Sequence, residues 1–204
     1  MIYDITMTIH PEMMVYKNKP EKKVKIKQVN FFEKEGHYES EINFNLHTGT
    51  HIDYPLHMIK GGDNSRKENL NALIGSAKVF DLTNVEDKIT YEDIKNFKIE
   101  KDDFIIFKTK NSFDKEFNNN FIFVSETAAA YLVEKKVRGV GIDALGIERS
   151  QVGYPTHRLL LSNNIIILEG AMLSDVPEDN YTLYCLPLKV ANVEAAPVRA
   201  ILIK

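Results

Sequence analysis

The segment His47-Thr48-Gly49-Thr50-His51-Ile52-Asp53-Tyr54-Pro55-Leu56-His57 holds three of the six histidines of this 204-residue chain, with an aspartate among them. Imidazole and carboxylate groups are the side chains that bind first-row divalent metals. No cysteine lies nearby, whereas structural zinc sites usually contain several cysteine ligands. The segment therefore predicts most of a metal site, of the catalytic kind that keeps a ligand position open.

The spacing of these residues limits the local backbone. His47, His51 and Asp53 have the same parity, so an extended chain points all three side chains to one face. A helix would align only the two histidines, and the Thr-Gly-Thr sequence between them disfavours a helix. We therefore expect an extended or bent segment that follows a strand over residues 42–46. Gly49 would let the backbone approach a metal closely.

Composition restricts the class of protein and its partners. A hydrophobic share of 44% and a charged share of 27% are ordinary for a soluble globular protein. A net charge of -3 gives no reason to expect nucleic acid or an anionic membrane as a partner. The single cysteine, Cys185, allows no intrachain disulfide and is expected to be a small core residue, not a nucleophile. The chain start lacks a signal-peptide pattern, so we expect a cytoplasmic protein.

Hydrophobic periodicity predicts a single domain over residues 1–204, with strands at both ends and alternating strands and helices between them. This pattern indicates an α/β or mixed α+β fold built on a mixed sheet. The strands are expected near residues 24–32, 42–46, 77–82, 104–107, 121–124, 140–142, 165–168, 181–186 and 198–203. The helices are expected near residues 90–97, 125–139 and 156–161.

Several polar residues stand at the ends of these elements. Ser125 is expected to cap the longest helix and Gly139 to end it. Glu169 and Asp143 each follow an apolar strand, at the edge where α/β sites gather. By themselves, Glu169 would be a solvated strand-end charge, Asp143 a structural residue and His157 a histidine at a helix start.

The motif His-x-Gly-Thr-His-x-Asp-x-Pro-x-His resembles the signature of the cyclase family of metal-dependent hydrolases. The best-known members of this family are the bacterial kynurenine formamidases, also called arylformamidases. The resemblance implies a swivelling β/β/α domain that forms a homodimer or homotetramer. It covers nearly the whole chain and includes Gly141-Ile142-Asp143-Ala144, His157-Arg158-Leu159-Leu160, the strand ending in Glu169, Leu186-Pro187-Leu188 and Ala196-Pro197-Val198-Arg199-Ala200.

This resemblance implies a centre of two divalent metal ions per chain. His47, His51 and Asp53 would bind the first ion, and Asp53 would bridge to the second. His157 would bind the second ion, and Glu169 would contact both. Bridging suits a carboxylate because it has two oxygens. Zinc is the first expectation for the metal, with manganese as the alternative.

The resemblance also implies a reaction at an amide bond. A hydroxide activated by two metals would attack the amide carbon, and His57 would carry the proton to the leaving nitrogen. The leading hypothesis is hydrolysis of N-formylkynurenine to kynurenine and formate, the arylformamidase step of tryptophan catabolism. Isatin-hydrolase-like opening of a small cyclic amide or lactone is an alternative. A metal-binding protein without turnover is another, although such a protein would not need His57.

The sequence departs from the family pattern in one region. Kynurenine formamidases typically carry a tryptophan near the N-terminus that lines the substrate pocket, and this chain has no tryptophan. Tyr16 lies in the matching region and is expected to be the substrate-stacking aromatic residue. Lys17 or Lys19 would instead meet a carboxylate on a different substrate. The small molecule that binds is therefore the open question.

Overall fold

The main sheet closes on itself in the computed structural model, which describes residues 1–204. Its strands are β1 (Ile2–Asp4), β4 (His51–Asp53), β5 (Ile74–Asp81), β7 (Phe104–Lys108), β9 (Gly139–Ile142), β10 (Ile166–Glu169), β11 (Asp179–Pro187) and β12 (Ala195–Ile203). Their order is β1-β12-β11-β5-β7-β9-β10-β4, and β12 also pairs with β4, so the ring is complete. The pairs β5–β7, β7–β9 and β9–β10 are parallel and the others antiparallel, which confirms the predicted mixed sheet.

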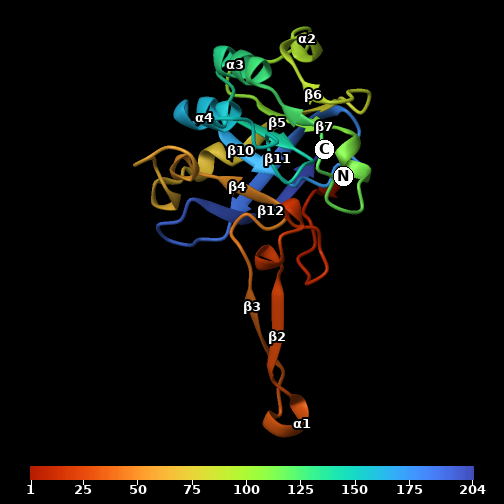
Figure 1. Cartoon of the computed structure of the whole chain (residues 1–204), viewed down its shortest axis with the longest axis vertical. Helices are drawn as coiled ribbons and strands as arrows, with labels where there is room; N and C mark the ends of the chain where they lie inside the picture. Colours follow the sequence, from red (N-terminus) through yellow and green to blue (C-terminus); the bar gives the residue numbers. More distant parts are fainter.

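Two apolar cores lie on the two faces of this sheet. Strand β7 shows the division, because Phe104 and Ile106 belong to a cluster of 19 buried residues, most of them from other strands of the ring. Ile105 and Phe107 point to the other face, into a cluster of 22 buried residues. This second cluster lies beneath α2 (Tyr91–Ile94), α3 (Glu126–Lys135) and α4 (Pro155–Ser162), which gather on one side of the sheet (Figure 1). Burial on both faces explains the unbroken apolar run of β7.

The helix signals in the sequence are largely confirmed. Thr90 and Asp93 form a capping box at the start of α2, and the Ser125 hydroxyl accepts a hydrogen bond from an amide in the first turn of α3. The predicted end of α3 was wrong, because Lys136 takes the left-handed conformation that closes the helix. Gly139 instead begins β9, where a Cβ atom would lie 2.2 Å from the Phe104 ring. Packing, not helix termination, requires that glycine.

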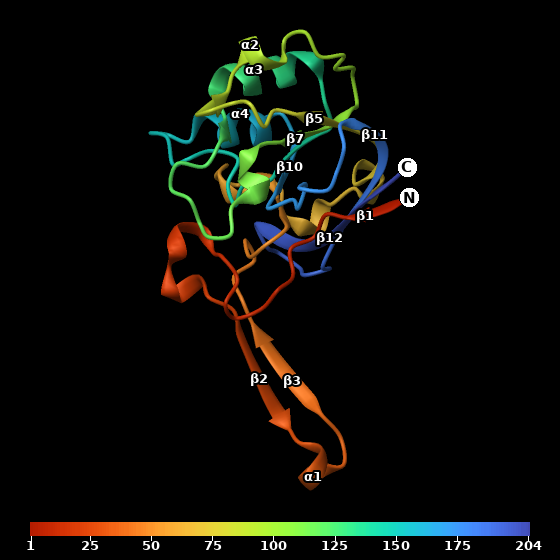
Figure 2. The ribbon, with the colours of Figure 1, turned by 90° about the vertical axis from the view of Figure 1, so that its right-hand side faces the viewer.

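A long hairpin projects from the body as an arm (Figures 1 and 2). It consists of β2 (Lys25–Asn30), a short α1 (Phe32–Glu35) and β3 (Glu39–Asn43). The strand expected over residues 42–46 is therefore displaced, since β3 ends at Asn43 and belongs to the arm. It does not run into the histidine segment, because the chain turns between residues 44 and 50 before β4 begins.

The remaining elements are short. Strands β6 (Lys88–Ile89) and β8 (Phe123–Val124) form a separate parallel pair. Single 3-10 turns complete the fold: η1 (Tyr16–Asn18), η2 (Pro20–Lys22), η3 (Pro55–His57), η4 (Ser65–Lys67), η5 (Leu70–Ala72) and η6 (Lys110–Phe113). None of the helices has the length and apolarity required to cross a bilayer. The expected cytoplasmic location remains a prediction.

Candidate metal centre

Strand β4 places two of the predicted ligands on one face of the sheet. It is inserted between β10 and β12, and its register sets His51 opposite Glu169. Ile52 points into the core inside the ring, so His51 and Asp53 point to the opposite face, as the period of a strand requires. Pairing between segments more than 100 residues apart thus brings His51 and Glu169 together.

The first cluster of ligand atoms forms around His51. Its Nε2 atom lies 3.3 Å from Glu169 Oε2 and 3.6 Å from Asp53 Oδ1. The turn before β4 returns His47 to the same point, with Nδ1 at 3.0 Å from Asp53 Oδ1 and 3.2 Å from His51 Nε2. Gly49 enables this turn by adopting a positive φ of 64°.

A second cluster forms on the other oxygens of the same two carboxylates. His157 lies in the first turn of α4, and its Nε2 atom is 3.3 Å from Glu169 Oε1 and 3.7 Å from Asp53 Oδ2. One oxygen of Asp53 faces His47 and His51, and one oxygen of Glu169 faces His51. The other oxygen of each carboxylate faces His157. This is the arrangement that two bridging carboxylates would provide.

His57 stands at the open side of both clusters. Pro55 begins η3, and the turn directs His57 Nε2 to 4.0 Å from Asp53 Oδ2. The His57 ring centroid lies 4.3 Å from that of His47 and 5.5 Å from that of His157. Its side chain is 23% exposed, whereas those of His51 and Asp53 are fully buried. All six residues singled out for metal binding and proton transfer thus converge.

The donor set fits a divalent metal ion. Both carboxylate oxygens of Asp53 are buried and accept no well-aligned hydrogen bond, although His47 Nδ1 lies 3.0 Å from Oδ1, and a bound cation would relieve this costly state. Burial raises the pKa of Glu169, but hydrogen bonds from His157 and His51 outweigh it and hold the pKa well below its ordinary value. Imidazole nitrogens and ionised carboxylates together are the ligands that zinc and related dications select. The site can therefore hold a divalent metal.

Known proteins share this sequence and fold. The model of the cyclase family matches residues 3–149. The kynurenine formamidase of Salinibacter ruber is 33% identical over 172 residues, covering 80% of this chain and 81% of that protein. The cyclase-like protein 3 of Oryza sativa subsp. japonica is 33% identical over 177 residues, covering 81% of this chain but only 65% of its own length.

The chain belongs to the cyclase family. A solved structure described as a "predicted metal-dependent hydrolase from Bacillus stearothermophilus" is 51% identical, with a TM-score of 0.91, and the match covers 99% of this chain and 97% of that one. An isatin hydrolase bound to thioisatinate has the same fold at 22% identity, with a TM-score of 0.87 and coverage of 98% and 91%.

Two acidic residues that the sequence does not predict lie beside these histidines. Glu148 is buried, and its Oε1 atom lies 2.6 Å from His157 Nδ1, which leaves the Nε2 atom of that ring facing the ligand clusters. Glu194 approaches His47 Nε2 at 3.5 Å from the loop before β12. Neither residue stands in a recognisable spacing with the histidines it contacts. Only the folded chain reveals them.

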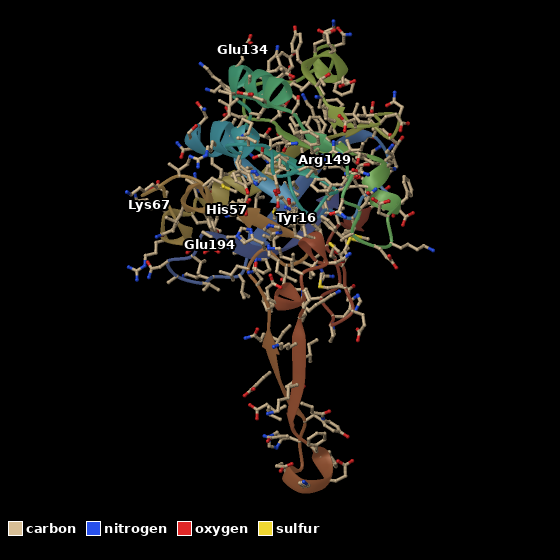
Figure 3. The ribbon with its side chains drawn as sticks, viewed as in Figure 1. Tyr16, His57, Lys67, Glu134, Arg149 and Glu194 are labelled. Atoms are coloured by element: carbon tan, nitrogen blue, oxygen red, sulfur yellow. The ribbon has the colours of Figure 1, made fainter.

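Tyr16 lies beside this centre, in η1. Its hydroxyl is 2.8 Å from the Ser150 hydroxyl, two residues beyond Glu148. Its ring packs edge-on against Phe117 and Phe121. Figure 3 labels Tyr16, His57 and Glu194 in the lower half of the body, above the root of the arm. The position is compatible with the predicted substrate-stacking role, which remains a prediction.

Proposed function

We propose that this chain is a metal-dependent amidohydrolase that cleaves the C–N bond of a small amide, with N-formylkynurenine as the leading substrate and kynurenine and formate as products. The observation that carries the proposal is the pair of buried carboxylates, Asp53 and Glu169, each facing histidines on two sides, with His57 beside them. The similarity to a kynurenine formamidase along 80% of the chain supports this choice of reaction.

The same residues suggest how the metal would be held. His47, His51 and Asp53 would hold one divalent ion and His157 a second, with Asp53 bridging the two and Glu169 contacting both. We propose zinc, with manganese as the alternative, because the donors are nitrogen and oxygen only. When bound, such ions polarise a carbonyl and make water nucleophilic at neutral pH. The protein contributes the fixed positions of the ligands and the burial around them.

His57 is suited to move the proton. Burial lowers the pKa of its ring, the neighbouring His47 and His157 lower it further, and Asp53 acts in the opposite direction. The ring is therefore neutral at pH 7, and its Nε2 atom can accept a proton and then donate it to the departing amine nitrogen. Its greater exposure places it between the buried carboxylates and an entering substrate.

The decisive experiment separates turnover from metal binding. The His57→Ala variant should lose at least about a hundredfold in kcat on N-formylkynurenine, the usual contribution of a positioned acid–base group, and keep its metal content. His10→Ala, which alters an exposed histidine paired with Glu12, is the matched control. Metal loss in His57→Ala would make His57 a ligand, a role that its proximity to His47 and Asp53 also allows.

The choice of substrate is tested with the same preparations. N-formylkynurenine, isatin and a simple lactone are offered to the protein loaded with zinc or manganese. Preference for isatin would favour opening of a cyclic amide. Inactivity on the whole panel, with metal bound, would favour a metal-binding protein without turnover. A protein that binds no divalent ion at all would overturn the proposed centre.

We also propose that the active form is a homodimer or homotetramer. The arm supports this assembly, because an isolated two-stranded hairpin is only marginally stable in water. Several of its large apolar side chains are exposed in the single chain: Ile26, Phe31, Phe32, Tyr38 and Ile42. A second copy of the chain would cover them.

A further inference from the structure

Two lysines lie against the ring of Tyr16 without an acidic partner. The Nζ atoms of Lys17 and Lys22 are 5.4 and 5.3 Å from the ring centroid. The only side-chain hydrogen bond of Lys17 goes to the Ser150 hydroxyl at 3.0 Å, and neither ammonium has a carboxylate within salt-bridge distance. Lys19, in contrast, has an acidic neighbour, because its Nζ atom lies 3.8 Å from Glu21 Oε1. The pair at Tyr16 is therefore an uncompensated positive charge on an aromatic surface.

This charge lies close to the metal centre. The loop over residues 146–150 makes the connection, since the Ile147 amide donates to Glu169 Oε1 at 2.5 Å and Ser150 contacts both Tyr16 and Lys17. Burial and the neighbouring charge of Lys19 lower the pKa of Lys22, and the charge of Glu169 acts in the opposite direction. A small molecule held at Tyr16 would thus reach the ligand clusters.

The backbone around Tyr16 is unusual. Lys17, Asn18, Ser150 and Tyr154 are non-glycine residues with φ between 50° and 59°. Such conformations are sparsely populated and concentrate where a surrounding structure fixes side chains for a purpose. Here they direct Lys17 onto Ser150 and place Tyr154 near His157, with ring centroids 6.4 Å apart. The chain holds this surface in place against local preference.

We propose that Lys17 and Lys22 select amide substrates that carry a carboxylate. This inference rests on the proposed amidohydrolase function and narrows its substrate class. The carboxylate would be held by the two ammonium groups and the Ser150 hydroxyl, as a charge-assisted contact. The rest of the substrate would lie along Tyr16, with its amide directed to the metal centre. The lysines would thus bind and orient the substrate and take no part in bond cleavage.

A matched pair of substrates tests the inference. The compounds 3-formamidobenzoate and 3-formamidobenzamide present the same formamide and differ only in the charge of the second group. We expect the kcat/KM of the wild-type protein to favour the carboxylate about tenfold or more, since a hydrogen bond to a charged group is worth that much. The Lys17→Ala/Lys22→Ala double variant should lose this ratio, mainly through KM. Raising the ionic strength should reduce it in the wild type.

Two control variants complete the design. Lys101→Ala removes an exposed lysine that lies beside Asp102, away from Tyr16, and should leave the substrate ratio unchanged. Lys17→Arg/Lys22→Arg keeps both charges and should retain the preference. Equal kcat/KM for the two compounds in the wild type, with both hydrolysed, would overturn the inference while leaving the amidohydrolase function intact.

A binding measurement keeps the inference testable if neither compound is hydrolysed. Benzoate and benzamide are titrated calorimetrically onto the zinc-loaded wild type and the alanine double variant. Weaker benzoate binding in the double variant, by about tenfold, would support carboxylate recognition even if the proposed reaction failed. Equal benzoate affinity in the two proteins would overturn it.

Discussion

The histidines of the proposed metal centre are oriented by different acceptors. His51 Nδ1 lies 2.9 Å from the carbonyl oxygen of Gly49, whereas His157 Nδ1 lies 2.6 Å from the Glu148 carboxylate. Burial lowers the pKa of His157, but its hydrogen bonds to Glu148 and Glu169 outweigh burial and raise the pKa to about 10. Without metal, the ring is therefore protonated at neutral pH, and metal binding must release that proton.

Glu148 should accordingly control metal affinity. Glu148→Gln replaces a charged acceptor with a neutral amide and should weaken metal binding by about 10- to 100-fold, as loss of a partner behind a ligating histidine commonly does. Competition with a chelator of known affinity measures this. Glu134→Gln, on the exposed face of α3 and far from the site in Figure 3, is the control. Unchanged affinity in Glu148→Gln would show that Glu148 does not support His157.

The single thiol should be inert in the folded protein. Cys185 is fully buried in the core inside the ring, and burial raises the pKa of its thiol above the ordinary range. Reaction with a disulfide reagent such as DTNB should be negligible in buffer and should reach one equivalent in concentrated guanidinium chloride. Rapid reaction of the native protein would mean that β11 opens readily.

The element that joins the two halves of the site is the junction after β10. Gly170 follows Glu169 with a φ of 69°, and a Cβ atom there would lie 2.5 Å from the carbonyl oxygen of Gly49. The Thr50 hydroxyl donates to the Gly170 carbonyl at 2.6 Å. The turn that carries His47 and the strand that carries Glu169 therefore meet backbone to backbone, and only glycine fits.

The Gly170→Ala variant should reveal how much this close backbone contact matters for stability. Backbone strain and steric overlap together are expected to lower the free energy of unfolding by on the order of 2 kcal/mol or more, and metal affinity should fall with it. Gly61→Ala is the matched control, because Gly61 also has a positive φ, 73°, with open space around it. Chemical denaturation of the two variants gives the comparison. Equal losses would assign the whole effect to backbone strain.

Local sequence predicted most elements but not all their positions. The apolar run of β7 and the capping box at Thr90 identify a strand and a helix because both signals are local. The alternation of Ile42, Phe44 and Leu46 predicts a strand over residues 42–46, but β3 ends at Asn43 and belongs to the exposed arm. A strand of the arm and a strand of the main sheet have the same period, so the alternation does not distinguish them. Gly139 resembles a helix end in the sequence, because the side chain that requires a glycine there, the Phe104 ring, is 35 positions away.

The site was more predictable than the fold around it. His47, His51, Asp53 and His57 lie within one motif whose residue types signal a metal centre without any knowledge of the sheet. Their meeting with Glu169 depends on the pairing of β4 with β10, which periodicity does not specify. Glu148 carries no local signal at all, because its role is set by the position of α4.

At the scale of the whole molecule, the arm is the part without a core of its own. All five residues of β3 are exposed, and Ile26 pairs with Ile42 at the arm's root. A groove of about 660 Å³ lies there, lined by Ile42 and Phe44 from the arm side and by Leu186 and Leu188 from the body. The exposed apolar side chains of the arm and those of the groove would both be covered if two chains paired about a two-fold axis.

Removal of the arm should therefore abolish association. Replacing residues 25–43 with a short glycine–serine linker is expected to give a monomer in sedimentation velocity, while the thermal midpoint of the body changes little because neither large core uses arm residues. Phe31→Ser/Phe32→Ser/Tyr38→Ser should weaken association by removing apolar contacts at the arm's tip, whereas Lys27→Ala, an exposed charge on the arm, should not. If the arm-deleted chain keeps the oligomeric state of the wild type, the assembly must use another surface of the body.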